Sequence, residues 1–264
     1  MITNEIIDAF AECKYKSVLK SKYKTGIKSE YETLESELLL TYRNEYSKNL
    51  YSKYDVIENF NTEKLYPPGF TYAINPVFEN MEYSIGFDAI EINSKSGITP
   101  IVISSKERVS HNDKIALLLK CFIVNQIKSL NIENANIVYG KGLQTLKIKI
   151  GIGDKKIKKL SDELIQLLEN IQPTEFYRNN HCSICEFQSE CKTKWIEKDH
   201  LSLLGGMNKK EVLKRNNRGI FSILQLSHTF RPKKYRKPKG KSKRYYPELK
   251  ALALRKKQTY LWEL

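Results

Sequence analysis

The spacing of apolar residues along the chain changes from helical to alternating and back, and each change predicts an element. Near-helical spacing predicts a first helix at residues 4–24, with Cys13 on an apolar face that also carries Ile6, Ile7, Phe10, Tyr15 and Leu19. A second helix is predicted at 29–51, after a break at Gly26, with an apolar stripe of Leu34, Leu38 and Leu39.

Alternating apolar and polar residues predict strands further along the chain. Residues 83–92 alternate as one strand, 93–97 form a turn, and 99–104 return as a second strand, which together predict a hairpin. A strongly apolar helix is predicted at 112–130, and Cys121 within it is expected to be a plain core residue.

The remaining patterns complete the predicted fold. Strands are predicted at 135–139 and 144–150, and an amphipathic helix at 155–171. Helices, a hairpin, a buried helix, two more strands and a helix in that order predict an α/β core with a mixed sheet. Three shorter helical patterns follow, at 208–215, from 222 to 226, and at 247–258.

Composition narrows the class of protein and its partners. The chain has 264 residues, of which 41% are hydrophobic, so it can bury a core and global disorder is excluded. A formal net charge of +15 favours polyanionic partners, with nucleic acid ahead of an acidic membrane, although a solvated basic surface is the alternative.

Membrane insertion and secretion are not expected. No window reaches the roughly twenty apolar residues of a membrane span, and the first residues lack a signal-peptide pattern. The five cysteines are an odd number with three packed together, which favours metal binding in a reducing cytoplasm over disulfides.

Three thiols form the most distinctive motif of the chain. Cys182, Cys185 and Cys191 have C-x2-C-x5-C spacing, which leaves one position of a tetrahedral metal site for another ligand. A histidine, His181 or His200, would complete a zinc site, whereas the thiol of Cys13 would suit an iron–sulfur cluster. The residues alone leave both readings open.

The hairpin is the candidate catalytic element. Many metal-dependent nucleases hold Mg²⁺ with an Asp at the end of one strand and a D/E-x-K motif on the next. Asp88 fits the first half, but Val102 and Ser104 stand where the Glu and Lys belong. Lys106 and Glu107 follow in reversed order and are the residues that could take over these roles; a lone Asp on a strand is otherwise structural.

The last part of the chain offers two candidate nucleic-acid-binding features. The helices at 208–215 and 222–226 are joined at Arg218 and Gly219, where backbone N–H groups could meet a phosphate; the alternative is an ordinary helix pair. Residues 231–244 contain nine Lys and Arg in fourteen positions, which predicts a phosphate-binding arm or a solvated tail. The arm's candidate phosphate-binding residues are Arg231, Lys233, Lys234, Arg236 and Lys237.

Together these motifs resemble a known family. One thiol in the first helix and C-x2-C-x5-C near the end of a nuclease-like core resemble the iron–sulfur RecB-like nucleases of the PD-(D/E)XK superfamily. The branch with a downstream RNase H-like domain is the most similar. The resemblance rests on the segments 181–187, 199–204, 218–226, 229–232 and 249–255.

The resemblance implies a restriction-endonuclease-like sheet flanked by helices in residues 1–198, closed by the cysteines. A helix-hairpin-helix-like segment would follow at 199–230, and 231–264 would hold the basic arm and the start of a downstream domain. It also implies a 4Fe–4S cluster on Cys13, Cys182, Cys185 and Cys191, with Zn²⁺ as the alternative. Asp88 would bind Mg²⁺ or Mn²⁺ with Glu32, or with Glu35 in its place.

Three functions follow as hypotheses. The first is a metal-dependent DNA nuclease, with DNA favoured over RNA and with a downstream RNase H-like or helicase domain or subunit as partner. The second is a catalytically degenerate DNA-binding or assembly module, which the departures at Val102 and Ser104 favour, together with the loss of the family's Gln from 115–119. The third is a zinc-stapled nucleic-acid-binding protein without nuclease ancestry.

Overall fold

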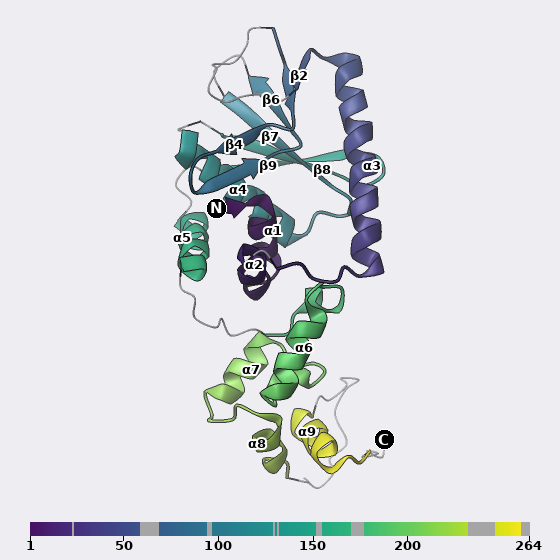
Figure 1. Cartoon of the computed structure of the whole chain (residues 1–264), viewed down its shortest axis with the longest axis vertical. Helices are drawn as coiled ribbons and strands as arrows, with labels where there is room; N and C mark the ends of the chain where they lie inside the picture. Colours follow the sequence, from purple (N-terminus) through teal and green to yellow (C-terminus); the bar gives the residue numbers. More distant parts are fainter. Residues whose placement is uncertain are drawn as a thin grey trace, which may run out of the picture. The chain divides into compact units, whose positions relative to one another are not determined.

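The computed structural model describes residues 1–22, 24–58, 69–93, 97–128, 130, 132–151, 155–169, 177–231 and 246–259. The chain divides into two compact units, Met1–Glu175 and Phe176–Leu264 (Figure 1). The domain limit expected at residue 198 therefore lies inside the second unit. Within the described residues, no helix combines the length and apolar character that crossing a membrane requires.

The first helical segment is two helices, so the prediction of one helix at 4–24 is wrong in its middle. After the short strand β1 (Ile2–Thr3), α1 (Asn4–Glu12) ends where the N–H of Cys13 donates to the carbonyl of Ala9. Cys13 has extended backbone angles, φ −160° and ψ 117°, and α2 (Lys14–Ser21) begins after it. The apolar face of α1 is buried as predicted, with Ile6, Ile7 and Phe10 in the core.

The second predicted helix is confirmed as α3 (Glu30–Lys53). It begins with a capping box, in which Ser29 and Glu32 satisfy each other's backbone N–H groups. Its predicted apolar stripe is wrong at Leu34 and Leu38, which are 54% and 38% exposed, whereas Leu39 is partly buried and packs against the sheet. Tyr42 and Leu50, further along the helix, are the residues it buries.

Two sheets make up the strand layer. The larger has six strands in the order β2-β3-β6-β7-β8-β9, and the smaller has the order β1-β5-β4. Both mix parallel and antiparallel pairs. The α/β class with mixed sheets is therefore confirmed. The strands are β2 (Val56–Glu58), β3 (Tyr72–Ile74), β4 (Val77–Glu79), β5 (Tyr83–Gly86), β6 (Ala89–Asn93), β7 (Gly97–Ser104), β8 (Asn134–Tyr139) and β9 (Gln144–Lys149).

The single strand predicted at 83–92 is wrong, because β5 and β6 belong to different sheets. The chain leaves the first sheet at Phe87, whose N–H donates to the carbonyl of Pro76. It enters the second at Asp88, whose N–H donates to the carbonyl of Ile101. The hairpin of β6 and β7 is antiparallel as predicted, with Ala89 opposite Ile101.

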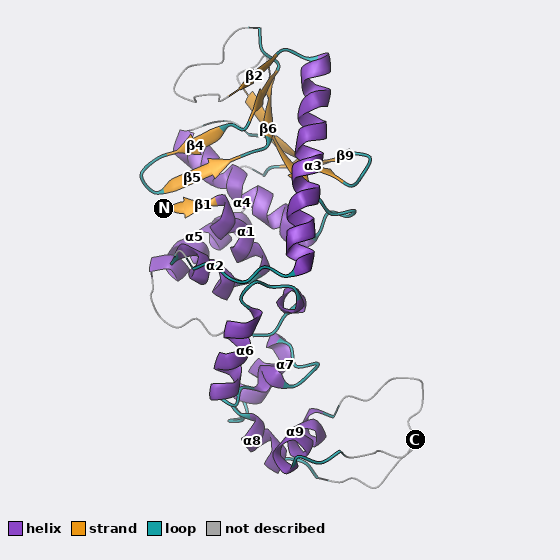
Figure 2. Cartoon of the chain, turned by 45° about the vertical axis from the view of Figure 1, so that its right-hand side comes forward, coloured by secondary structure: helices purple, strands orange, loops and turns teal. Residues whose placement is uncertain are grey.

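Helices cover both faces of the six-stranded sheet (Figure 2). The apolar residues of α3 pack on one face with Ile74, Ala89 and Ile101. The predicted helices α4 (His111–Lys128) and α5 (Lys155–Glu169) pack with α1 on the other face, against Ala73 and Ile90. Successive residues of a strand, such as Ala89 and Ile90, belong to different clusters. The strands therefore contribute side chains to a separate apolar core on each face of the sheet.

The second unit is helical in its described residues. It contains the 3-10 turns η1 (Asn180–Ser183) and η2 (Leu201–Leu203) and the helices α6 (Gln188–Glu197), α7 (Lys209–Asn216), α8 (Ile223–His228) and α9 (Pro247–Lys256). The helices predicted at 208–215, from 222 and at 247–258 are confirmed. A small apolar core holds the unit together: Leu201, Leu204, Met207, Val212, Ile223, Leu226 and Ala251.

Candidate functional site

Asp88 lies in the two-residue link between β5 and β6, and its side chain is only 9% exposed. Its Oδ1 atom lies 2.6 Å from Nε of Arg43, which projects from α3. Its Oδ2 atom accepts a hydrogen bond of 2.6 Å from the backbone N–H of Ile103 on β7. Both carboxylate oxygens therefore have protein partners.

Two cations act on this buried carboxylate. Burial raises the pKa of Asp88, while Arg43, the N–H of Ile103 and Lys120 each act to lower it. Lys120, from α4, is 5% exposed and lies 2.7 Å from Oδ1 of Asp8 on α1. Arg43 and Lys120 thus supply positive charge at the carboxylate that was predicted to bind a divalent metal.

The register of the hairpin places Val102 across from Asp88, one step beyond the pair of Ala89 and Ile101. Val102 is half-buried and packs against the core cluster of α1 and α4. Ser104, two residues further on, accepts a hydrogen bond of 3.3 Å from the N–H of Lys106. The position expected to carry a second metal-binding carboxylate therefore carries an apolar side chain.

Lys106, the second predicted catalytic residue, belongs to a separate charged group. Lys106 lies 2.7 Å from Oδ1 of Asp113. Burial raises the pKa of Glu35, Lys106 opposes that rise, and the carboxylates of Glu12, Asp113 and Glu32 add to it. Lys106 and Glu32 therefore act on Glu35, while the charges acting on Asp88 come from Arg43 and Lys120.

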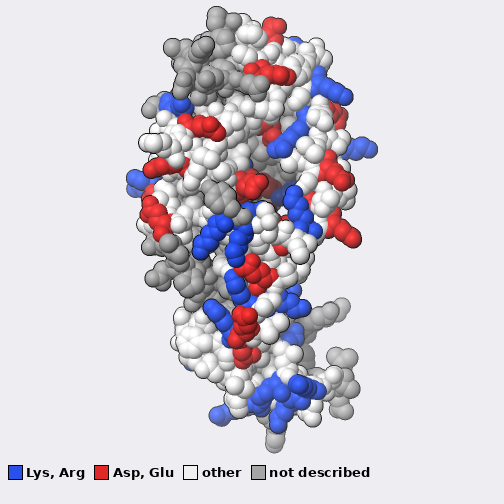
Figure 3. Space-filling view, viewed as in Figure 1, with Lys and Arg blue, Asp and Glu red and all other residues white. Residues whose placement is uncertain are grey.

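Glu107 is exposed, and its carboxylate lies beside Gly140 in the turn between β8 and β9. In the space-filling view, acidic and basic side chains surround a hollow in the first unit (Figure 3). Across the described part of the chain, no group of three or more His, Cys, Asp and Glu side chains is arranged to hold a metal ion.

Sequence reasoning missed Arg43 and Lys120. Lys120 stands inside a strongly apolar helix, where a charged side chain needs a buried partner. Arg43 follows Tyr42, which is buried, by one position and precedes Tyr46 by three, so it borders the face of α3 that covers the sheet. The lysine within the apolar run of α4 and the arginine beside the buried face of α3 were the signals that could have revealed them.

The thiol segment is held by hydrogen bonds around Asn179. The side-chain oxygen of Asn179 accepts from the N–H groups of His181 and Cys182, at 3.0 and 3.2 Å, and caps η1. The backbone N–H of Asn179 lies 3.3 Å from Sγ of Cys182 and donates to it. The Sγ–H of Cys182 donates in turn to the side-chain oxygen of Asn179 at 3.3 Å, so Asn179 fixes the position of this thiol.

Two large buried side chains anchor the same segment. Phe187 and Trp195 are 3% and 6% exposed, and the N–H of Cys191 donates to the carbonyl of Phe187 at 3.0 Å. Cys182, Cys185 and Cys191 are themselves half-buried. Their sequence spacing is that of sulfur ligands to zinc or iron, but the described side chains are not arranged around an ion, so the metal site stays a prediction.

The fourth ligand stays a prediction. Cys13 is half-buried at the break between α1 and α2 and belongs to the first unit. His200, the rival ligand for zinc, accepts a hydrogen bond of 3.1 Å at Nδ1 from the N–H of Ser202 and so caps η2. Cys121 is fully buried, and burial raises the pKa of its thiol, which agrees with its predicted place in the core.

The turn between α7 and α8 does not present backbone N–H groups to a phosphate. Each N–H from residue 217 to 225 donates to a protein acceptor. Those at the start of α8 meet Asp199, whose carbonyl accepts from Ile223 and whose carboxylate accepts from Leu224 at 2.7 Å. Because these donors are in use, the structure favours the ordinary helix pair, and Arg218 can contribute only through its exposed side chain.

The basic excess lies entirely in the second unit. Residues 1–175 carry 23 Lys and Arg and 23 Asp and Glu, whereas residues 176–264 carry 22 and 7. Lys and Arg side chains gather at the end of this unit that carries α9 (Figure 3). Arg231 is exposed, and Lys233, Lys234, Arg236 and Lys237 lie outside the described residues.

Comparisons with known proteins add little to this site. No protein-family model and no curated protein matches the chain. A solved structure titled "Crystal structure of SSO0001" is similar over 46% of this chain, with 19% identity and a TM-score of 0.31. The chain covers 59% of that structure. A likeness of this size defines neither a fold family nor a function.

Proposed function

We propose that this chain is a DNA-binding protein with a restriction-endonuclease-like first unit that has lost metal-dependent cleavage. The observation that carries this choice is the pairing of Asp88 with Arg43, opposite Val102. A metal-dependent nuclease needs at least two oxygen ligands on the protein and open positions for the phosphate and the attacking water. Here the one carboxylate is bound by a guanidinium and its expected partner is apolar.

The distribution of charge supports DNA binding by the second unit. Its 22 basic residues against 7 acidic ones favour contact with phosphates, while the first unit is formally neutral. A nuclease must also hold DNA against its catalytic unit, and a unit without net positive charge gives little long-range attraction for a polyanion. The charge therefore agrees with binding by the second unit without cleavage by the first.

The thiols are assigned to a structural cofactor in this proposal. Cys182, Cys185 and Cys191 would hold a 4Fe–4S cluster with Cys13 as the fourth ligand, as the family resemblance implies. Zn²⁺ on the same three thiols is the alternative. When bound, such a group supplies covalent cross-links that stabilise the fold.

Cleavage and binding measured on one sample test the proposal. We expect labelled linear DNA to bind at low salt and to stay intact with Mg²⁺ or Mn²⁺. Wild type is compared with Asp88→Ala and with Asp162→Ala, which removes an exposed carboxylate on α5. Robust cleavage by wild type and Asp162→Ala, but not by Asp88→Ala, would contradict the loss of activity.

The alternative function is hydrolysis of DNA by the first unit. Its specific support is the charged group of Glu32, Glu35, Lys106 and Asp113, which combines carboxylates with a lysine. Glu35→Gln and Lys106→Ala in the same assay separate this alternative from the first. Cleavage that depends on these residues and not on Asp88 would favour it.

A further inference from the structure

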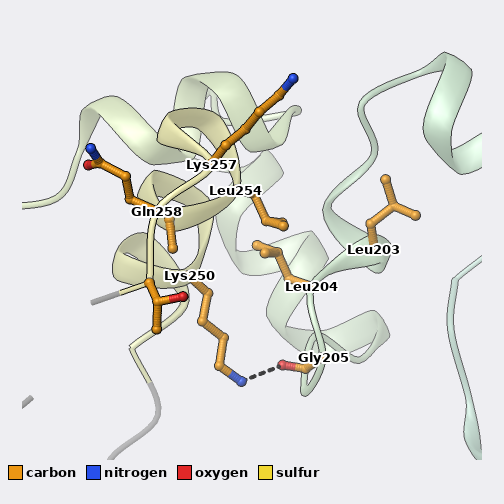
Figure 4. Close-up of a pocket in the computed structure, with 9 residues that line it drawn as sticks. Leu203, Leu204, Gly205, Lys250, Leu254, Lys257 and Gln258 are labelled. Carbon is orange, nitrogen blue, oxygen red and sulfur yellow. Dashed lines mark hydrogen bonds between the residues drawn. The ribbon is translucent and has the colours of Figure 1, made fainter. Parts of the chain in front are cut away.

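The second unit contains a pocket between η2 and α9 with a volume of about 530 Å³. Leu203, Leu204 and Leu254 give it an apolar wall, and Lys250, Lys257 and Gln258 give it polar groups. In Figure 4 the side chains of Leu204 and Leu254 approach one another, while Lys250 extends towards the backbone at Gly205, just after η2. Its Nζ atom donates a hydrogen bond of 3.3 Å to the carbonyl of Gly205.

The residues that line this pocket favour a ligand with both an anionic group and an apolar part. Two of its residues are lysines, and none of the described residues that line it is acidic. The hydrogen bond to Gly205 holds the ammonium group of Lys250 at the edge of the apolar wall. Leu254 is 56% exposed, so the wall is open to a ligand from solvent. Pockets of roughly 300–1,000 Å³ accept small molecules and cofactors, a range that includes a nucleotide.

We propose that this pocket accepts an unpaired nucleotide of the bound DNA, with its base against Leu203 and Leu254 and its phosphate beside Lys250 and Lys257. The proposal rests on the DNA-binding function assigned to this unit. It requires an unpaired nucleotide because the faces of a base in a duplex are already stacked on neighbouring base pairs.

A nucleotide is favoured over an acidic peptide by the charge around the pocket. The described end of the chain from 246 to 259 carries four basic residues and one acidic residue, Glu248, whose carboxylate lies 2.7 Å from Arg215. A surface of this kind attracts a polyphosphate backbone along its length. An aliphatic wall has no preference among the four bases, so binding is expected to be tolerant of sequence.

Two DNAs with the same number of phosphates test the proposal in the full chain by fluorescence anisotropy. One is fully paired, and the other contains unpaired nucleotides. We expect wild type to bind the second about tenfold more tightly, which is at the low end for a base contact. Leu254→Glu places a negative charge in the pocket at an exposed position and should remove this preference. Leu213→Glu, at a leucine 38% exposed on α7, is the matched control and should keep it.

Each outcome supports or overturns the pocket separately from the DNA-binding function. Equal affinity of wild type for both DNAs, or a preference that survives in Leu254→Glu, would overturn the pocket and leave DNA binding intact. Absence of binding to either DNA would contradict the proposed function itself. An acidic leucine-containing peptide that binds wild type but not Leu254→Glu, without any preference for unpaired DNA, would assign the pocket to a protein partner instead.

Discussion

The ion pair of Arg43 with Asp88 is the main argument against a metal site in the first unit. A buried carboxylate without a partner is costly, and proteins resolve that cost with a metal ion, a hydrogen bond or an opposite charge. Asp88 has a backbone hydrogen bond and a guanidinium, with Lys120 as a second cation nearby. The same Asp that would serve a nuclease as a metal ligand can therefore serve here as a structural link between α3 and the sheet.

Arg43→Ala tests this structural role. The substitution leaves the carboxylate of Asp88 buried without its cation, which should lower the free energy of unfolding by roughly 1–3 kcal/mol at neutral pH. Because burial already raises the pKa of Asp88, loss of Arg43 should raise it further. The deficit should shrink as the pH falls and Asp88 becomes protonated in both proteins. Urea unfolding at several pH values measures it.

Two variants make that measurement specific. Arg108→Ala removes an exposed arginine in the turn after β7 and should change stability little. Arg43→Ala combined with Asp88→Asn removes the buried charge with its partner and should recover most of the loss. A deficit in Arg43→Ala no greater than in Arg108→Ala, or one that grows as the pH falls, would show that the ion pair does not stabilise the unit.

At the scale of elements, periodicity predicted the class of fold and most helices but not the points where elements break. Cys13 has helical neighbours on both sides, and only its extended backbone separates α1 from α2. The strand predicted at 83–92 fails for a similar reason, because alternation continues through Phe87 and Asp88 while the chain changes sheets. Such breaks depend on distant acceptors, here the carbonyls of Pro76 and Ile101, which a local pattern does not contain.

The candidate sites were predictable to the extent that they depend on residue type. The thiol motif, Asp88 and the apolar residue at 102 are legible in the sequence, and the register of β6 and β7 agrees with the expected position of Val102. The residues that pair with these groups could not be predicted from the sequence. Arg43 is 45 positions from its partner Asp88, and Asp199 is 25 positions from its partner Leu224. Long-range pairing is set by packing of whole elements, which spacing alone does not specify.

The proposed metal centre is testable at the scale of its segment. We expect protein purified without oxygen to be brown and to contain iron and sulfide. Serine at Cys13, Cys182, Cys185 or Cys191 should abolish or strongly reduce the iron content, because each replaces a thiolate ligand. Cys121→Ala is the matched control, since Cys121 is a fully buried core thiol, and it should keep its iron. Iron analysis and visible absorption check both.

Two results would change the assignment of that centre. Stoichiometric zinc without iron would replace the cluster by a zinc site. Full iron content in the Cys13→Ser protein would remove Cys13 from the ligands and leave the fourth position to another residue. In either case the Asn179 hydrogen bonds would still hold Cys182 at the start of the segment.

At the scale of the whole molecule, the two units differ in net charge. The net charge of +15 belongs to residues 176–264, while residues 1–175 are balanced. The arm at 231–244 alone contributes nine basic residues and no acidic ones. Since binding of a Lys or Arg to a phosphate releases counterions, the dependence of DNA affinity on salt reports how much of this charge meets the DNA.

Replacing the nine Lys and Arg of 231–244 by Ser and Gln, with the length unchanged, isolates the arm's contribution. For B-DNA the logarithm of the binding constant falls with the logarithm of salt by about 0.9 for each phosphate that the protein neutralises. Every phosphate that the arm no longer neutralises should therefore flatten the slope by about that amount. Neutralising four exposed lysines of α5, Lys155, Lys156, Lys158 and Lys159, is the control, because they belong to the balanced unit. An unchanged slope in the arm variant would make 231–244 a solvated tail and leave DNA binding to the helices of the second unit.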